Sequence, residues 1–380
     1  MTGRKKHVCF VTGTRAEFGL LRPMIEAAKQ EKDLKTSVIV AGLHLTTGTW
    51  RDVKAAGIKI DAKVRMQKKS EVGRWADVEA VSRGVKGFGE AFAEMKVDVV
   101  AVLGDRVEAF AAASAASIGG RYVVHVHGGD RAEGVADEAM RHAITKLAHL
   151  HFAASKQSMQ RLIRLGERKD DVYLVGSPAI DGLGFVSANS CDEDGVDLIV
   201  LQHPVGETNT IEKRWMMETL VAARIMAEKY DWKVLVLWPN GDVGAKGIGD
   251  AIDGFEKSLK KVVRERFRFV DHVPRREFVT LLAWAKVILG NSSAGLIEAA
   301  ALKTAAVNVG PRQNGREKPR SVVDCDYGKE NVMAGVERAV KMNLLRMKHP
   351  YGDGTAGKRM AKILAEIDLG DVSLRKCNTF

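Results

Sequence analysis

Cysteine is scarce in this sequence, and the few cysteines are scattered. The 380 residues include four, with no Cys-x-x-Cys pair among them: Cys9, Cys191, Cys325 and Cys377. This spacing argues against a disulfide framework and a structural zinc site, and it favours a reducing, cytoplasmic location. Long apolar runs are also absent, because no stretch approaches the ~18 residues that a membrane-spanning helix needs. The short run Val8–Val11 is typical of a first strand and not of a signal peptide.

Aromatic residues make up only 6% of the chain, but the remaining composition is that of a folded protein. Charged residues account for 28% and apolar residues for 46%, which excludes global disorder. A chain of this length is expected to form two domains with full cores. Lys and Arg number 59 against 48 Asp and Glu, and this net charge of +11 favours anionic partners. The basic residues are spread out without an aromatic–basic motif, so we expect a phosphorylated small molecule and neither nucleic acid nor a membrane.

The dominant pattern is a short β-branched run, a turn with glycine, and then an amphipathic stretch. The runs predict strands at His7–Thr12, Thr36–Ala41, Val97–Leu103, Tyr122–Val126, Leu198–Leu201, Lys233–Trp238, Val287–Leu289 and Ala305–Val309. The stretches between them predict helices at Leu20–Glu31, Trp75–Glu94, Val107–Ser117, Asp137–Leu147, Lys156–Leu165, Lys213–Lys229, Gly254–Glu265, Arg276–Ala285 and Gly295–Ala301. This alternation predicts an α/β fold of two Rossmann-like domains, each with roughly four to six parallel strands buried on both faces.

Turn-forming and acidic residues around Ala179–Gly195 predict a linker between the domains. We therefore expect an N-terminal domain over residues 1–180 and a C-terminal nucleotide-binding domain over residues 181–355. The last segment, residues 356–380, contains a predicted helix at Gly357–Ile367 that returns to the first domain. Open α/β sheets bind ligands at the carboxyl ends of their strands, so we expect the functional residues there, where the two domains face each other across a cleft.

Two predicted strands of the first half end in residues suited to a charged ligand. After the first strand, Gly13 allows a tight turn, the following helix start offers amide groups to an anion, and Arg15 adds positive charge. This turn is neither a dinucleotide-binding Gly-x-Gly-x-x-Gly nor a P-loop, and an ordinary turn with a surface arginine is the alternative. Asp105, followed by Arg106, ends the strand Val97–Leu103, and a helix N-cap is the alternative there.

The densest polar segment of the chain runs from His125 to Lys146. His125 and His127 are two residues apart, so on a strand they would share one face. Asp137 and Arg141 are four residues apart on a predicted helix, where they would pair and where the helix dipole favours a carboxylate at the start. Two histidines without a clear third ligand argue against a metal site. The two glycines between these groups indicate backbone that approaches a ligand.

The second half carries a candidate diphosphate site. Ser292 and Ser293 lie in a turn of small residues at a helix start, which has the form of a phosphate cradle. Glu298 follows on the first turns of that helix, within reach of a ribose diol, although a serine-capped helix with a capping-box glutamate is the alternative. His203 ends an earlier strand, where a structural histidine is the alternative. Two arginines after the last predicted strand would neutralise a leaving group: Arg312 and Arg316.

Six segments match, in order, the motifs of one enzyme family. They lie within residues 7–335 and comprise Gly13–Leu21, Gly104–Arg106, Asp137–Lys146, Val175–Pro178, His203–Pro204 and Asn291–Glu298. On these segments the chain resembles the hydrolysing UDP-N-acetylglucosamine 2-epimerases of sialic-acid-type biosynthesis. The run Arg141–Lys146 is the most specific of the matches.

This resemblance implies a glycosyltransferase-B-like pair of Rossmann-like domains, a nucleotide-sugar substrate, no metal and no redox cofactor. The implied reaction removes the proton at C2, expels the nucleoside diphosphate from C1 to leave a 2-acetamidoglucal, adds water at C1, and reprotonates C2 on the opposite face. We expect UDP-N-acetylglucosamine to be converted to N-acetylmannosamine and UDP. We also expect a homo-oligomer, either a dimer or a tetramer.

The implied chemistry needs a base and an acid on opposite faces of C2, together with cationic and backbone groups for the departing diphosphate. Each such donor contributes ~3 kcal/mol, by analogy with oxyanion sites. The resemblance implies these catalytic candidates: Asp105, His127, Asp130, Asp137 and Arg141, the last orienting Asp137. The candidates for binding the nucleotide and diphosphate are Arg15, Arg106, His203, Ser292, Ser293, the amide of Gly295, Glu298 and Arg312.

Two positions depart from the pattern of many relatives, which carry glutamate where this chain has His127 and Asp130. The departures leave the C2 base open, and they allow a UDP- or GDP-linked 2,4-diacetamido-6-deoxyhexose as the substrate. A non-hydrolysing epimerase, a glycosyltransferase of the same architecture and a silent sugar-nucleotide sensor are further alternatives. The residues Asp137 and Glu138, followed by the run Arg141–Lys146, favour the hydrolysing branch.

Overall fold

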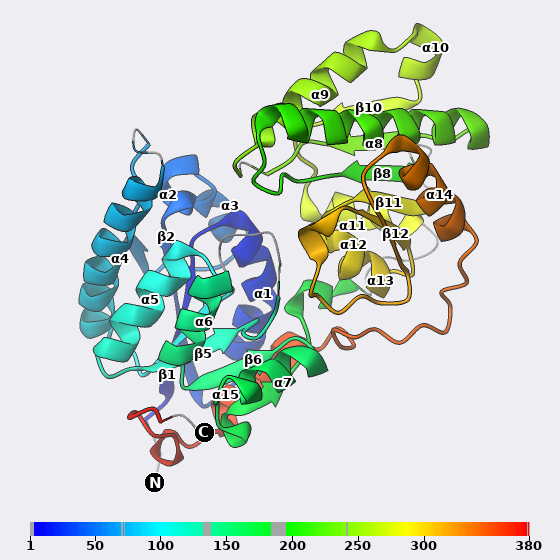
Figure 1. Cartoon of the computed structure of the whole chain (residues 1–380). Coiled ribbons are helices and arrows are strands. Elements are labelled where there is room, and N and C mark those ends of the chain that lie inside the picture. Colours follow the sequence, from blue (N-terminus) through cyan, green and yellow to red (C-terminus); the bar gives the residue numbers. More distant parts are fainter. Residues whose placement is uncertain are drawn as a thin grey trace. The chain divides into compact units, whose positions relative to one another are not determined.

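The computed structural model describes residues 4–69, 71, 73–131, 138–183, 195–240, 242–377 and 379. Within these residues the chain forms two compact units, which Figure 1 shows with the chain coloured from its start to its end. The first unit runs to Asp130, resumes at residue 138, continues to Gly182, and takes up the chain again from Tyr351. The second unit contains Arg131 and the described residues between Leu183 and Pro350.

A seven-stranded parallel sheet forms the centre of the first unit. Its strands are β1 (Lys6–Thr12), β2 (Leu34–Ala41), β3 (Ala62–Val64), β4 (Val99–Leu103), β5 (Tyr122–Val126), β6 (Leu150–Ala153) and β7 (Val172–Leu174), in the spatial order β3-β2-β1-β4-β5-β6-β7. Its helices are α1 (Arg15–Gln30), α2 (Leu43–Thr47), α3 (Trp50–Ala55), α4 (Arg74–Met95), α5 (Val107–Ile118), α6 (Glu138–Leu147), α7 (Lys156–Arg164) and α15 (Ala356–Glu366). Short 3-10 helices lie at Lys169–Asp171, Pro178–Ile180 and Leu369–Asp371. The chain order reverses between β1 and β4, and folds of this kind bind ligands at such a reversal.

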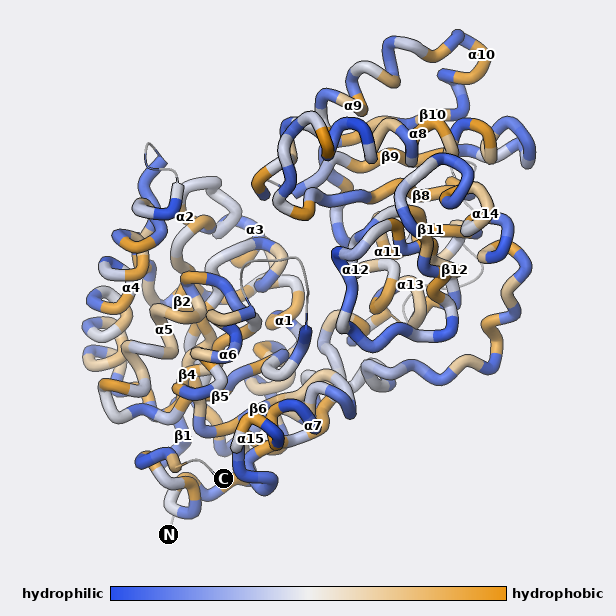
Figure 2. The backbone as a smooth tube through the Cα atoms, in the orientation of Figure 1, coloured by the Kyte–Doolittle hydropathy of each residue, from blue (hydrophilic) through white to orange (hydrophobic). Residues whose placement is uncertain are grey.

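Helices cover both faces of this sheet, and the strands are buried accordingly. Along β1, Val8 and Phe10 pack with residues of α1 and α15, whereas Cys9 and Val11 pack with residues of α4 and α5. Strands buried on both faces need apolar residues at every position, not at alternate ones. Figure 2 shows the result as orange stretches along the strands, with more blue on the helices.

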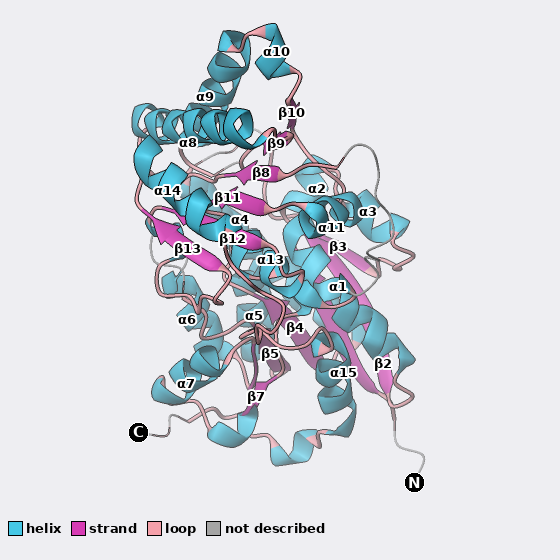
Figure 3. Ribbon diagram, turned by 90° about the vertical axis from the view of Figure 1, so that its right-hand side faces the viewer, coloured by secondary structure: helices cyan, strands magenta, loops and turns pink. Residues whose placement is uncertain are grey.

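The second unit has the same layered design around a six-stranded parallel sheet. Its strands are β8 (Leu198–Leu201), β9 (Val234–Leu237), β10 (Phe267–Val270), β11 (Val287–Gly290), β12 (Ala305–Val309) and β13 (Val322–Cys325), in the spatial order β10-β9-β8-β11-β12-β13. Its helices are α8 (Asn209–Tyr230), α9 (Ala245–Ser258), α10 (Lys261–Arg264), α11 (Arg275–Trp284), α12 (Ser293–Leu296), α13 (Glu298–Ala301) and α14 (Lys329–Val340), with a 3-10 turn at Pro311–Gln313. Leu198 and Val200 pack with residues of α8, α9 and α14, and Ile199 faces the layer of α11 and α13. Figure 3 shows the helices in cyan beside the magenta strands.

The predicted α/β fold with two Rossmann-like sheets is confirmed. The first sheet is larger than expected, because its short strands β3, β6 and β7 were not predicted, and β10 and β13 of the second sheet were also missed. The helix predicted at Gly254–Glu265 is wrong, since α9 ends at Ser258 and a separate short helix, α10, follows. Three glycines inside α9 weaken its helical pattern, and one of them, Gly249, is needed because a Cβ there would lie 2.7 Å from the ring of Trp238.

The end of the chain packs on the first unit. Helix α15 lies against α1, where a Cβ on Gly357 would come within 2.7 Å of the backbone of Pro23. Beyond α15, the hydroxyl of Tyr122 donates to the carbonyl of Leu369 over 2.6 Å. Among the described helices, none combines the length and the apolar composition that crossing a bilayer requires.

Candidate active site

The turn after β1 differs from the prediction in one respect: its amides are already bonded within the chain. Thr14 caps α1, and Oε2 of Glu17 accepts hydrogen bonds from the amides of Gly13, at 2.8 Å, and Thr14, at 2.9 Å. These amides are therefore not the open anion site that we expected. Arg15 lies beside this turn with its side chain half-exposed, and its Nε is 2.9 Å from the carboxylate of Asp52.

A second carboxylate lies directly beneath this turn. Glu108, on the first turn of α5, is fully buried, and a Cβ on Gly13 would lie 2.5 Å from its Cγ. The amide of Gln67 donates to Glu108 over 2.8 Å, and Nε of Arg106 donates to its other oxygen over 3.4 Å. Burial, followed by repulsion from Glu108, raises the pKa of Glu17 to about 7. Arg106 thus balances the negative charge of the buried Glu108.

Asp105 lies at the carboxyl end of β4 and forms an ion pair with Arg141 of α6. The Asp105 side chain is 22% exposed, whereas that of Arg141 is 6% exposed. Arg141 also donates from Nη1 to the carbonyl of His127 over 3.1 Å. One guanidinium therefore joins the ends of the neighbouring strands β4 and β5. Asp137, the predicted partner of Arg141, lies outside the described residues.

The two histidines around the end of β5 do not share a face, which corrects the prediction. His125, the last residue but one of β5, is buried in the unit, with Nδ1 3.1 Å from the hydroxyl of Thr145 and Nε2 2.8 Å from the carbonyl of Gly104. Burial lowers the pKa of His125 to about 3, so this imidazole is neutral. His127 lies beyond the strand with φ of 65°, in the left-handed region, and the period of two therefore does not reach it.

His127 instead bonds across its own turn. Its Nδ1 lies 2.9 Å from Oδ2 of Asp130, and its Nε2 lies 3.1 Å from the hydroxyl of Ser177, which follows β7. The other carboxylate oxygen of Asp130 accepts a hydrogen bond from Ser158 of α7 over 2.6 Å. The carboxyl ends of β4 and β5 thus carry two carboxylates, Asp105 and Asp130, that are linked through Arg141 and the His127 turn.

At the corresponding edge of the second unit, His203 and Asn291 hold each other in place. Asn291 accepts from the amide of His203 over 2.7 Å and donates to its carbonyl over 2.8 Å. Nδ1 of His203 accepts from the amide of Asn240 over 3.1 Å, so the ring hydrogen of the neutral imidazole is on Nε2. Burial, with a smaller contribution from Arg312, lowers the pKa of His203 to about 3. The imidazole is therefore a neutral donor through Nε2.

Arg312 forms no ion pair with the described residues, although the carboxylate of Asp242 acts on it electrostatically. It lies after β12, and its Nη1 donates weakly to the carbonyl of Asn291 over 3.4 Å. Its Nε is buried and has no hydrogen-bond partner among the residues that the structure describes. Burial and the neighbouring Arg316 lower the pKa of Arg312, although a guanidinium stays charged at neutral pH. A buried guanidinium nitrogen with no acceptor fits an anionic ligand.

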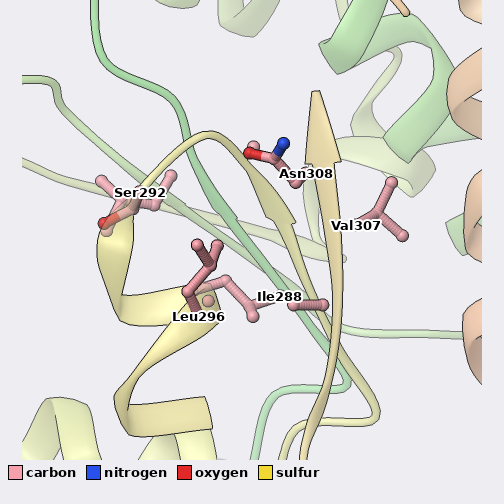
Figure 4. Close-up of a pocket in the computed structure, with 9 residues that line it drawn as sticks. Ile288, Ser292, Leu296, Val307 and Asn308 are labelled. Atoms are coloured by element: carbon pink, nitrogen blue, oxygen red, sulfur yellow. The ribbon is translucent and has the colours of Figure 1, made fainter. Parts of the chain in front are cut away.

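The small-residue turn after β11 borders a small cavity between the ends of β11 and β12. Figure 4 shows Ser292 and Asn308 toward the strand ends of this cavity, with Ile288 of β11 and Leu296 of helix α12 below them in the view. The Ser292 hydroxyl accepts from the amide of Ala294 over 3.3 Å, as an N-cap does. Ser293 is the first residue of α12.

Two nucleotide-binding candidates near this turn are already bonded within the second unit. The amide of Gly295 donates to the carbonyl of Ser292 over 3.1 Å, so it is not free for a phosphate as we expected. Glu298 starts α13 with its carboxylate 3.2 Å from Nη1 of Arg275.

Several residues of these networks were missed from the sequence. Ser158 and Ser177 bond to the Asp130–His127 pair but lie on other elements, 28 and 50 residues away along the chain. The capping box of Thr14 and Glu17 had a visible signal, the Thr-x-x-Glu spacing before a helix. In the part of the chain that the structure describes, no group of three or more His, Cys, Asp or Glu side chains is arranged to hold a metal ion.

A model of the UDP-N-acetylglucosamine 2-epimerase family matches residues 26–365 of the chain. The chain is 34% identical to the UDP-N,N'-diacetylbacillosamine 2-epimerase (hydrolyzing) of Legionella pneumophila, over 99% of this chain and 100% of the relative. It is 27% identical to the UDP-N-acetylglucosamine 2-epimerase of Neisseria meningitidis, over 98% of each chain. Its fold is similar to that of the Methanocaldococcus jannaschii UDP-GlcNAc 2-epimerase solved in complex with UDP-GlcNAc and UDP, with a TM-score of 0.77 at 20% identity over 94% of this chain and 99% of that one.

Proposed function

The chain belongs to the UDP-N-acetylglucosamine 2-epimerase family and is a nucleotide-sugar epimerase, and from this premise we propose that it hydrolyses a UDP-linked 2-acetamido sugar with inversion at C2. The products are UDP and the free 2-epimeric sugar. The relative with 34% identity over the whole chain favours a 2,4-diacetamido sugar, UDP-N,N'-diacetylbacillosamine, and UDP-N-acetylglucosamine is the second candidate. The observation that carries the acid–base half of this proposal is the pair of carboxylates, Asp105 and Asp130, linked through Arg141 and the His127 turn.

The proposed chemistry begins with removal of the C2 proton by one carboxylate. The electron pair forms the C1–C2 double bond as the C1–O bond breaks, and UDP leaves with the bonding electrons. Water then adds through its oxygen to C1, and C2 takes a proton on the opposite face. Asp105 is the proposed base because its carboxylate is paired with Arg141 and is the more exposed of the two carboxylates. Asp130, with His127, is the proposed second acid–base group, and Asp137 remains a candidate for the same step.

The leaving diphosphate requires positive charge and hydrogen-bond donors. In the second unit, Arg312 offers a buried guanidinium nitrogen that lacks an acceptor among the described residues, and His203 offers its Nε2 hydrogen. Ser292 and Ser293 complete the proposed cradle, and Glu298 is the proposed acceptor for a ribose hydroxyl. From the first unit, Arg15 and Arg106 are proposed to add positive charge. We further propose that the enzyme is a cytoplasmic homo-oligomer that serves sialic-acid-type biosynthesis.

The test is product analysis in deuterated water enriched in oxygen-18, with both candidate UDP-sugars offered separately. The proposal expects a free 2-epimeric sugar with deuterium at C2 and oxygen-18 at C1, and unlabelled UDP. Oxygen-18 in UDP would mean attack at phosphorus, and retained C2 hydrogen with retained configuration would mean simple hydrolysis. An intact epimerised UDP-sugar would place the chain among the non-hydrolysing epimerases. Sugar transfer only when an acceptor is added would make it a glycosyltransferase.

A further inference from the structure

The turn that carries His127 and Asp130 is held in a conformation that most residues avoid. His127 has φ of 65° and Gly129 has φ of 74°. A side chain with a Cβ adopts the left-handed region at a cost of roughly 1–2 kcal/mol, so other contacts must hold His127 there. Gly129 also needs to be glycine, because a Cβ there would lie 2.9 Å from Cγ of Leu162 and still closer to the carbonyl oxygen of Ser158. Helix α7 therefore shapes this turn.

Both ring nitrogens of His127 are bonded, and the two partners together determine which nitrogen carries hydrogen. An ionised carboxylate only accepts, so Nδ1 of His127, at 2.9 Å from Asp130, must be the donor. Nε2 of the neutral ring is then an acceptor, and the hydroxyl of Ser177 at 3.1 Å donates to it. The Ser177 oxygen in turn accepts from the amide of Ala179 over 3.2 Å. With this arrangement every hydrogen in the group has an acceptor.

The opposite protonation state leaves a hydrogen without an acceptor. If Nε2 also carried hydrogen, the Ser177 oxygen would accept from both His127 and Ala179, and its own hydrogen would need a further acceptor. In the part of the chain that the structure describes, Ser177 has no such acceptor, and its side chain is completely buried. Leaving a buried hydroxyl hydrogen unpaired is costly, so the neutral ring is the favoured state.

The Asp130 carboxylate is fixed by the same construction. Oδ2 faces His127, and Oδ1 accepts from the Ser158 hydroxyl over 2.6 Å. Ser158 lies one turn before Arg161, whose guanidinium donates to the carbonyl of Gly129 over 3.0 Å. These two contacts, one at each oxygen, fix the orientation of the carboxyl group.

We propose that Ser177 is a positioning residue of the epimerase, which locks His127 as the neutral tautomer protonated at Nδ1 and thereby orients the Asp130 carboxyl group, with Ser158 as the second support. This inference rests on the proposed function, and it answers the question that the sequence left open between His127 and Asp130. Because both nitrogens of His127 are engaged, the imidazole acts through Asp130, and Asp130 is the group in this turn that faces the proton-transfer chemistry.

Several charged groups surround this pair and contribute to its protonation state. Arg141 bonds to the carbonyl of His127, and Asp105 is paired with Arg141 on the far side. The neutral His125 lies beneath the turn, with its Nδ1 2.9 Å from a Cβ placed on Gly128. Arg161 of α7 lies beside the same turn, where its guanidinium donates to the carbonyl of Gly129. These groups remain in the variants described next, so the comparison isolates the serine hydroxyl.

The test compares Ser177→Ala with Ser177→Cys, using the full chain labelled with nitrogen-15 at histidine. The alanine variant leaves space, whereas the cysteine variant fills it with a poor hydrogen-bond donor, so a change common to both reports on the hydroxyl. Ser37→Ala is the matched control, because Ser37 is a buried serine whose hydroxyl lies 3.0 Å from Nε2 of another histidine, His7, on β1. The His127 resonances, among ten histidines, are assigned by their loss in His127→Gln.

In the unmodified protein we expect the nitrogen shifts of His127 to show hydrogen on Nδ1 and none on Nε2. In both Ser177 variants we expect a mixture of tautomers or the imidazolium, together with kcat lowered about 10–100-fold and KM changed less than about 3-fold, the usual scale for loss of a positioning partner. Ser158→Ala should lower kcat similarly while the Nδ1 tautomer is kept. Ser37→Ala should change neither readout.

Hydrogen on Nε2 of His127 in the unmodified protein would overturn the proposal, as would Ser177 variants that keep both the tautomer and kcat. A Ser177 variant that loses kcat with an unchanged His127 spectrum would show a purely structural role for the serine and would also overturn it. Failure of the unmodified protein to release UDP from either candidate sugar would refute the proposed function instead. In that case the nitrogen shifts alone still decide whether Ser177 locks the tautomer.

Discussion

Replacement of Asp105 by asparagine is the sharpest test of the first-unit site, because it removes a charge with almost no change of shape. The asparagine oxygen can still accept from Arg141, and the bond from Arg141 to the carbonyl of His127 does not involve residue 105. The turn should therefore persist. Hydrogen bonds to charged groups contribute about 1.5–3 kcal/mol, and since one neutral acceptor remains we expect a loss of folding stability near the lower end of that range.

The effect on catalysis should be much larger than the effect on folding. Asparagine cannot take a proton from C2, and loss of a general base lowers turnover by about 10²–10⁴-fold, which corresponds to about 2.7–5.4 kcal/mol of activation free energy. The affinity for free UDP should change little, because His203 and Arg312, the proposed diphosphate contacts, belong to the second unit. Turnover is measured as UDP release and as deuterium incorporation at C2, and affinity is measured by calorimetric titration.

Asp98→Asn is the matched control for this experiment. Asp98 immediately precedes β4, at the opposite end of the same strand, where it pairs with Arg4 over 3.0 Å and accepts from the amide of His7 over 2.9 Å. It should lower stability without lowering turnover. An Asp105→Asn enzyme that folds and keeps near-full turnover would refute the assignment and leave Asp105 as a structural partner of Arg141.

Three further changes test other parts of the structure. Arg312→Ala should weaken UDP binding about 10–100-fold in a calorimetric titration, because it removes the cation proposed to hold the diphosphate. The control Arg338→Ala, at an exposed arginine, should leave the affinity for UDP unchanged. An Arg312→Ala protein that binds UDP as tightly as the unmodified protein would remove Arg312 from the site. Gly129→Ala should lower the free energy of unfolding, measured in urea, by about 2–4 kcal/mol. The control Gly57→Ala, at a similar φ of 73° but with open space around its Cβ, should lower it by only about 1 kcal/mol. A similar loss in both variants would mean that the contacts around Gly129 can accommodate a Cβ. Glu17→Gln should flatten the pH dependence of the free energy of unfolding. The pKa of Glu17 is about 7 in the folded state against 4.5 in the unfolded state, so the protonated carboxyl stabilises the fold at low pH. This stabilisation, on the order of 3 kcal/mol, is lost as pH rises through about 7. Identical slopes for the two proteins between about pH 5 and pH 8 would contradict that account.

The sequence by itself determined the backbone plan of this protein. Strands buried on both faces read as continuous β-branched runs, and β5 and β8 were predicted residue for residue at Tyr122–Val126 and Leu198–Leu201. Most of the longer helices were also predicted, but α9 was misplaced, α14 was missed, and the helix predicted at Gly295–Ala301 is two short helices, α12 and α13. Since parallel strands place their carboxyl ends on one edge, it followed that Asp105 and His203 would end strands on the ligand-binding edges of their sheets. These conclusions depend on local periodicity and on turn chemistry, which neighbouring residues encode.

Only the tertiary structure decided which side chains meet at those edges. Local spacing predicted Arg141 beside Asp137, which lies outside the described residues, but it gave no sign of the bond from Arg141 to Asp105, 36 residues earlier in the chain. A period of two placed His127 on the face of His125, but the strand ends first and His127 turns into the left-handed region, where it contacts Ser177. Such pairings depend on the order of strands within the sheet and on the packing of α6 and α7 against it. Those contacts form between residues that are distant in the chain, so no local pattern in the sequence records them.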